Sequence, residues 1–169
     1  MKLTGNETPE ELTEHGRQIV LRQLAMMDRS RRQLLDAQTK RGVPLEIAVR
    51  VVDRFEEVGL VSDREFAEKL VRSKMAERPT SRRALARDLH RLGIDRELSE
   101  NALAQVSDDD EVQAAITLAT KKAAATSGLE DHVRRRRIYG ALARRGFSPD
   151  VCRKAAAAAL NDDQDNYLD

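Results

Sequence analysis

The sequence predicts an all-α protein of three tandem three-helix repeats, nine helices in all, arranged as an elongated, curved array. Three glycines, Gly42, Gly93 and Gly146, each end a basic amphipathic stretch, at intervals of 51 (93 − 42) and 53 (146 − 93) residues. A repeat at that spacing is typical of one supersecondary unit stacked in series. Because a unit of about fifty residues buries little core alone, we expect neighbouring units to pack on each other.

The composition also favours helices. The 169 residues are 40% hydrophobic and 35% charged but only 3% aromatic, which suits small cores of aliphatic residues better than a β-sandwich or barrel. The net charge of +1 does not by itself indicate nucleic acid, so the local distribution of charge is more informative. A single cysteine, Cys152, excludes an internal disulfide and a cysteine-based zinc site, and we expect it to be a buried thiol.

The first repeat is predicted over residues 8–60, and the termini at 1–7 and 162–169 are expected to be flexible. The segment Thr8-Pro9-Glu10-Glu11 offers an N-cap, a proline in the first turn and a glutamate that bonds back to the cap. It predicts a helix that reaches about Met27.

Two further helices complete this repeat. Ser30 followed by Gln33 repeats the capping pattern and predicts a second helix that ends at Gly42. A third helix is expected after Pro44, with apolar residues at helical spacing and Gly59 as its end.

The second repeat is predicted over residues 61–107. Its first helix opens on the capping box Ser62-Asp63-Arg64-Glu65. Ser81 caps a second helix with a leucine stripe, which ends at Gly93, and Asp95 caps a short third helix.

The third repeat is predicted over residues 108–161. Its first helix is expected to start at Asp108, with Glu111 three residues on, because acidic side chains interact favourably with the helix dipole at the N-terminus. The middle helix is expected over residues 134–145, and Ser148-Pro149 predicts the start of the last one.

Cations recur at matching positions of the three middle helices. Positions four apart share a helix face, and Arg83, Arg87 and Arg91 follow this spacing opposite the leucine stripe. Two of the three equivalent positions are also cationic in each of the other repeats. The candidate partner-binding residues are Arg32, Lys40, Arg83, Arg87, Arg91, Arg134, Arg136, Arg137, Arg144 and Arg145.

Such a basic stripe is suited to an acidic protein groove or to a phosphate backbone. Lys121 and Lys122 join the third patch if the loop after them brings that helix end close. For any single residue, an ordinary solvated face or an ion pair with a neighbouring helix remains an alternative.

The sequence lacks the patterns expected of an enzyme. It has no P-loop or dinucleotide fingerprint, and His15, His90 and His132 lack metal-ligand spacing. Asp63 and Glu65 are explained by helix capping rather than by acid–base catalysis. We therefore expect no catalysis, no cofactor and no metal. No apolar run is long enough to cross a membrane and no signal peptide is present, so we expect a cytoplasmic protein.

Two segments, in order and correctly spaced, carry a family resemblance. They are Val58-Gly59-Leu60-Val61-Ser62-Asp63-Arg64-Glu65-Phe66-Ala67 and Leu142-Ala143-Arg144-Arg145-Gly146-Phe147-Ser148-Pro149. Together with Asp28-Arg29-Ser30-Arg31-Arg32-Gln33-Leu34, they resemble the RecX family of bacterial recombination regulators, of the actinobacterial type. The resemblance extends from about residue 15 to residue 160.

The resemblance implies tandem three-helix repeats that bind the RecA recombinase filament within its helical groove. It further implies inhibition of ATP hydrolysis, strand exchange and coprotease activity, with roles in DNA repair, recombination and the SOS response. It implies neither cofactor nor catalysis. Single- or double-stranded DNA within or beside the filament is a further candidate partner, and since no heptad seam is present we expect a monomer.

The first repeat departs from the others at two positions. Gln38 stands where the other repeats have Leu89 and Leu142, and Asp36 interrupts the basic stripe. We therefore expect different packing in this repeat and the weakest partner contact there. Two rival functions remain: a helical-repeat protein that binds DNA directly through its basic face, and a purely structural adaptor.

Overall fold

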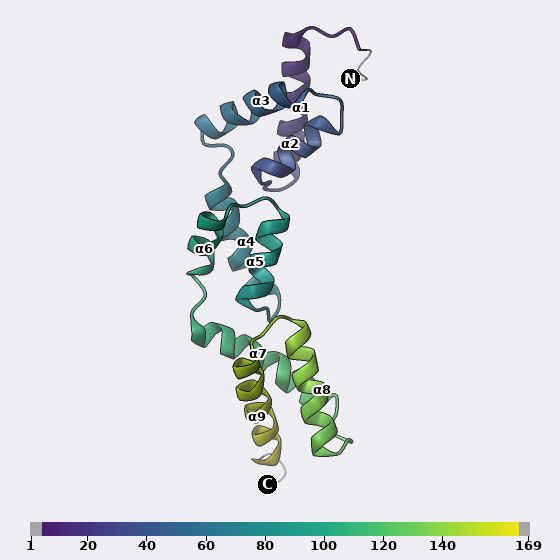
Figure 1. Cartoon of the computed structure of the whole chain (residues 1–169), viewed down its shortest axis with the longest axis vertical. Coiled ribbons are helices and arrows are strands. Elements are labelled where there is room, and N and C mark those ends of the chain that lie inside the picture. The colour runs from purple at the N-terminus through teal and green to yellow at the C-terminus, as the bar shows by residue number, and fades with distance from the viewer. Residues whose placement is uncertain (1–4, 166–169) are drawn as a thin grey trace. The chain divides into compact units, whose positions relative to one another are not determined.

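The computed structural model describes residues 5–165, and this part of the chain folds into nine α-helices without a strand (Figure 1). The all-α prediction is therefore confirmed. We refer to the successive helix trios as the first, second and third repeats. The helices are α1 (Pro9–Met26), α2 (Arg31–Thr39), α3 (Leu45–Glu57), α4 (Asp63–Glu77), α5 (Arg82–Arg91), α6 (Arg96–Leu103), α7 (Asp108–Ala124), α8 (Asp131–Arg144) and α9 (Pro149–Asp165).

Contacts divide the described chain into two compact units, and the division passes through the second repeat. The first unit joins residues up to 69 with residues 89–99. The second unit joins residues 70–88 with residues from 100 onward. Each unit thus holds one complete repeat together with part of the second.

The capping boxes predicted for the first two helices are confirmed. The Glu11 N–H donates to Thr8 Oγ1 at 3.3 Å, and the Thr8 N–H donates to Glu11 Oε2 at 2.8 Å. Ser30 and Gln33 form the same reciprocal pair, at 3.3 and 3.0 Å. Each box satisfies backbone donors that have no partner inside the helix, which fixes where α1 and α2 begin.

The core of the first unit lies among α1, α2 and α3, which Figure 1 shows together at the purple end of the chain. Ile19, Leu34 and Val52 are fully buried in it. Val43 and Val61, from the turns on either side of α3, also join this cluster. The helical spacing of aliphatic residues therefore produces the small core expected from the composition.

The core of the second unit lies among α7, α8 and α9, and alanine dominates it (Figure 1). Ala115, Ala119 and Ala155 are completely buried, so these helices need only small side chains at their contacts. Larger apolar side chains, among them Ile138, Leu142 and Phe147, supply the remaining volume. Cys152 is buried as expected, and burial raises the pKa of its thiol, which keeps it in the unreactive protonated form.

Helix α7 starts at Asp108 as predicted, and Ser107 caps it, because its Oγ accepts from the Asp110 N–H at 3.0 Å. Two other helix ends differ from the prediction. Helix α8 begins at Asp131, three residues before the expected start at 134. The backbone of α9 stays helical to Asp165, inside the segment expected to be flexible. The remaining tail residues, and residues 1–4, lie outside the described range.

Gln38 makes the first repeat pack differently from its neighbours, as predicted. Its side chain is fully buried, and Nε2 donates to the carbonyl oxygens of Leu34 at 3.2 Å and Ala48 at 3.3 Å. The bond to Ala48 ties α2 to α3. The other amide atom, Oε1, lies against α1 at Gly16, where an added Cβ would stand only 2.5 Å from it. Glycine at position 16 therefore provides the space that the larger polar side chain needs.

We expect Gly16→Ala to lower the free energy of unfolding by about 1 to 3 kcal/mol, the usual cost of overpacking. At an open helical site the same substitution would raise it by about 1 kcal/mol. Chemical denaturation followed by circular dichroism measures whether the substitution lowers or raises the free energy of unfolding. Adding Gln38→Ala to Gly16→Ala should make the alanine at position 16 favourable. If the effects of the two substitutions simply add, the proposed contact is absent.

His15 should make the stability of the protein depend on pH. Its side chain is only 6% exposed, and burial lowers its pKa from 6.5, assisted by the positive charges of Arg22 and Arg41. The folded state therefore favours neutral imidazole, and this contribution to stability is complete above pH 6.5 and is lost as the pH falls below it. Between about pH 7.5 and about pH 5.5, wild-type stability should fall more steeply than that of His15→Gln. The exposed His132→Gln should follow the wild type.

Candidate functional site

A junction between the first and second repeats fixes the N-terminus of α2. The Ser30 hydroxyl donates to the Leu92 carbonyl oxygen at 2.6 Å, and the Arg31 N–H donates to Asp63 Oδ1 at 2.7 Å. Arg31 is further held by ion pairs to Asp53 and Glu56 on α3. All of these residues belong to the first unit.

The second unit contains a junction of the same design between the second and third repeats. The Ser81 hydroxyl donates to the Arg145 carbonyl oxygen at 2.8 Å, and the Arg82 N–H donates to Glu111 Oε1 at 2.9 Å. The guanidinium of Arg82 pairs with Glu111 and with Asp108. The serine and the accepting carbonyl are therefore equivalent in the two junctions, since that carbonyl directly precedes Gly93 in one and Gly146 in the other.

The junctions correct two assignments made from local capping patterns. Ser62 caps α4 as the predicted box requires, because its Oγ accepts from the Glu65 N–H at 3.2 Å. Asp63 and Glu111 instead accept from the preceding repeat. Burial raises the pKa of Asp63, and the bond from the Arg31 N–H opposes this shift. The ion pair to Asp108 is the main cause of the raised pKa of Arg82, with Glu111 adding to it.

Glycine is required at both junctions for two reasons. Gly93 and Gly146 have φ angles of 82° and 86°, in the left-handed region that other residues avoid. They also lie against the preceding repeat: an added Cβ would stand 2.6 Å from Arg32 Cβ in the first unit and 2.8 Å from Ser81 Oγ in the second. Gly59 has a similar φ of 76°, but an added Cβ there would meet nothing within 4 Å.

In the first unit, the predicted partner-binding residues Arg32, Lys40 and Arg91 are all exposed. The stem of Arg32 lies along Gly93, at the end of the helix that carries Arg91. Neither Arg32 nor Lys40 forms an ion pair with another described residue. This exposure leaves their charges available to a partner.

In the second unit, Arg83 and Arg87 are exposed on α5. Arg87 extends toward the junction, where its Nη2 lies 3.4 Å from the place that a Cβ on Gly146 would occupy. Arg145 is exposed at the end of α8, and its Nη1 donates to the Pro79 carbonyl oxygen at 3.4 Å. The junction therefore gathers arginines of α5 and α8 in one region.

A hollow of about 570 Å³ between the end of α7 and the outer face of α8 gathers more of the predicted residues. We call it the basic cleft. Arg136, Arg137 and Arg144 line it together with Lys122, whereas Lys121 is not among the lining residues. The remaining lining residues are Ala125, Thr126, Gly140 and Ala141, so the lining contains no carboxylate.

Arg134 differs from the other candidate residues because its side chain is buried, with 8% exposed. Its Nη2 donates to the Ala123 carbonyl oxygen at 3.2 Å, which ties α8 to the end of α7. The expected surface position is therefore corrected for this residue. The sequence did contain a signal for it, since Arg134 lies four and eight residues before the buried Ile138 and Leu142, on the same helical face.

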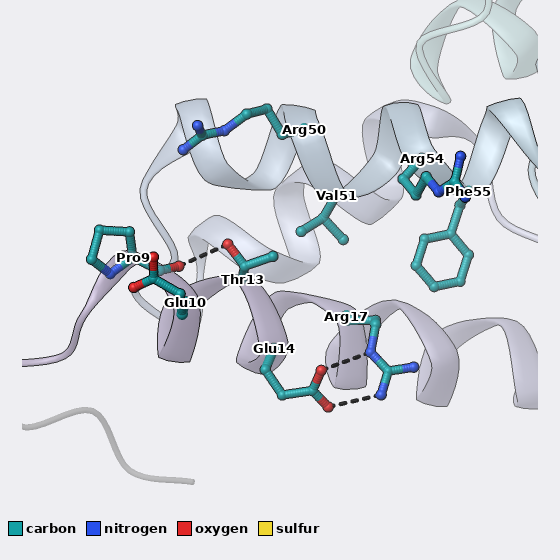
Figure 2. Close-up of a pocket in the computed structure, with 9 residues that line it drawn as sticks. All are labelled: Pro9, Glu10, Thr13, Glu14, Arg17, Arg50, Val51, Arg54 and Phe55. Carbon is teal, nitrogen blue, oxygen red and sulfur yellow. Dashed lines mark hydrogen bonds and ion pairs between the residues drawn. The ribbon is translucent and has the colours of Figure 1, made fainter.

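The sequence did not indicate a second hollow, of about 480 Å³, between α1 and α3 in the first unit (Figure 2). Val51 and Phe55 contribute its apolar surface. Glu14 forms a two-bond ion pair with Arg17, at 2.7 and 2.9 Å, along its edge. Both signs of charge line this hollow, so it does not extend the basic surface.

No group of three or more His, Cys, Asp or Glu side chains is arranged to hold a metal ion in residues 5–161. In the described chain, no helix combines the length and apolar character needed to span a membrane.

Comparison with known families gives two matches. Residues 62–103 match the model described as RecX, second three-helix domain, and residues 108–156 match RecX, third three-helix domain. The regulatory protein RecX of Streptomyces lividans is 41% identical over 157 residues, covering 93% of this chain and 84% of its own. The same-named protein of Thermobifida fusca is 43% identical over 144 residues, covering 85% and 78%.

Solved structures support the fold. The crystal structure of RecX from Lactobacillus salivarius superimposes with a TM-score of 0.81 at 23% identity, covering 89% of this chain and 97% of that one. A second structure, of a regulatory protein RecX, gives a TM-score of 0.77 at 18% identity, covering 85% and 70%. The helical architecture is therefore shared with both.

The junctions predict a difference between three glycine-to-alanine substitutions. Alanine at Gly59, Gly93 or Gly146 should cost about 1 to 2 kcal/mol for its left-handed backbone. At Gly93 and Gly146 it should cost about 1 to 3 kcal/mol more, because the Cβ meets the preceding repeat. Thermal and chemical denaturation of the three variants tests this order, with Gly59→Ala as the matched control. Equal losses at all three positions would contradict the packing role.

Proposed function

The chain belongs to the RecX family, whose matched members are named regulatory proteins, and we propose that it binds the groove of the RecA recombinase filament through its basic middle helices. In this proposal, binding inhibits the ATPase, strand-exchange and coprotease activities of the filament. The supporting observation is that Arg32, Arg83 and Arg136, at the equivalent position of successive repeats, are all exposed and form no ion pair with another described residue.

Repetition suits a polymeric partner. A filament presents the same acidic or DNA-binding groups at every subunit, and successive repeats present arginines at the same helical position. Several weak contacts of this kind add to a strong overall interaction without a deep pocket. ATP turnover falls in this scheme because the bound protein favours one filament state over another.

We further propose that the protein acts by binding alone. The exposed candidate residues are arginines and a lysine, which suit charge recognition rather than nucleophilic or acid–base chemistry at neutral pH. The partly buried ionisable groups of the junctions, such as Arg31, Arg82 and Asp63, are engaged in contacts that hold the fold together. They therefore have a structural use.

Direct DNA binding is the second candidate function, and the basic cleft favours it. Arg136, Arg137 and Arg144 gather there without an acidic lining residue. These side chains suit phosphate contact, whereas base-edge readout requires a mixture of Arg, Asn and Gln on one helix. The two candidates separate experimentally, because direct DNA binding needs no recombinase and weakens steeply with salt.

Charge reversal on α5 tests the filament proposal. The triple variant Arg83→Glu, Arg87→Glu and Arg91→Glu should raise the half-inhibitory concentration on the RecA–single-strand DNA ATPase by about tenfold to a hundredfold. This range corresponds to roughly 0.5 to 1 kcal/mol for each lost contact. The helical circular-dichroism signal should not change.

A matched control has the same change in net charge away from the middle helices: Arg22→Glu, Arg50→Glu and Arg64→Glu. It should inhibit like the wild type. The double variant Arg83→Glu with Arg87→Glu repeats the test without altering Arg91. Wild-type inhibition by both α5 variants would rule out this basic face as the contact.

A further inference from the structure

The basic cleft differs from the arginine clusters at the junction of the second unit because no acid offsets its charge. Arg82 pairs with Asp108 and Glu111, and the buried Arg134 has Asp131 at 3.8 Å. By contrast, the cations that line the cleft form no ion pair with another described residue, and the lining includes no carboxylate. Like charges held around one space repel each other, so the arrangement favours a bound anion.

The cleft exists because the third repeat has a glycine at the centre of the basic face. Gly140 occupies the position that Arg87 holds in the second repeat and Asp36 in the first. It stands four residues from Arg136 and from Arg144, so the two arginines share one face about 12 Å apart along the axis. The missing side chain makes room for the guanidinium of Arg144 to lie over this part of the helix, because an added Cβ would stand 3.2 Å from Arg144 Nη1.

The chemistry of the lining indicates an anion that only accepts hydrogen bonds. Three guanidinium groups and the Lys122 ammonium donate and never accept. The one hydroxyl of the lining, on Thr126, already donates to the Lys122 carbonyl oxygen at 2.8 Å. A planar guanidinium group can donate two parallel N–H bonds to the oxygens of one phosphate. The lining contains no aromatic side chain on which a base can stack, so the site has no means of reading bases.

We propose that the basic cleft binds neighbouring phosphates of a nucleic-acid backbone, with Arg136 and Arg144 holding separate phosphates. The binding is independent of base sequence. This assigns the direct DNA contact to the third repeat and rests on the second candidate function above, not on filament binding. Free polyphosphate has the same chemistry, and it therefore competes for the site.

The test measures binding of the full chain to a fluorescent mixed-sequence DNA duplex by anisotropy, across a salt series and without recombinase. The double variant Arg136→Ala with Arg144→Ala should lower the magnitude of the salt slope by about 2, one unit for each lost phosphate contact. At about 0.1 M salt its affinity should fall by about tenfold or more. The control Arg135→Ala with Arg153→Ala makes the same charge change outside the cleft. Its affinity should depend on salt more steeply than that of the Arg136→Ala and Arg144→Ala variant.

A second variant separates the cleft from net charge. Gly140→Leu keeps every cation, favours the helix and fills the space, and it should also weaken DNA binding severalfold. Wild-type affinity in this variant would overturn the proposal, as would equal salt slopes for the double variant and its control. Inorganic polyphosphate should displace the duplex, and displacement by polyglutamate at equal charge would instead indicate a carboxylate partner. Because no recombinase is present, failure here leaves the ATPase result for α5 unaffected.

Discussion

Each junction depends on one serine hydroxyl that forms two hydrogen bonds at once. Ser30 Oγ accepts from the Gln33 N–H of its own helix and donates to the Leu92 carbonyl oxygen of the next repeat. Ser81 does the same with Ala84 and Arg145. A hydroxyl has both a donor and acceptor sites, whereas an ionised aspartate, an equally good cap, has no proton to donate. Serine therefore starts the helix and joins the repeats with the same atom.

The two arginines that follow each serine have different uses. In the first and second repeats, Arg31 and Arg82 turn toward acids of their own unit. The next residues, Arg32 and Arg83, are exposed. A shift of one residue along the helix thus separates a guanidinium that stabilises the fold from one that stays available to a partner. The third repeat reaches the same division differently, because it buries Arg134 at the equivalent of the serine.

Much of the fold can be predicted from the sequence, because helix caps and apolar spacing act within a few residues. The box at Thr8 and the glycine-ended helices are examples. The junction partners are not predictable in this way, since Asp63 and Glu111 look like local caps but accept from residues 32 and 29 positions away. For the candidate site, the cationic positions follow from helical spacing. The cleft does not, because it depends on how the turn after α7 places α8 beside Lys122.

The serine bonds also determine when the contacts of each repeat can be completed during synthesis. The partners of Ser30 and Ser81 lie 62 and 64 residues further along the chain. The first and second repeats are therefore translated well before the carbonyl oxygen that each serine binds. Until that carbonyl is made, the surface around the serine stays exposed to solvent. Since domains usually fold from the N-terminus as they emerge, this chain acquires its last stabilising contacts in the first repeat only after the second has been made.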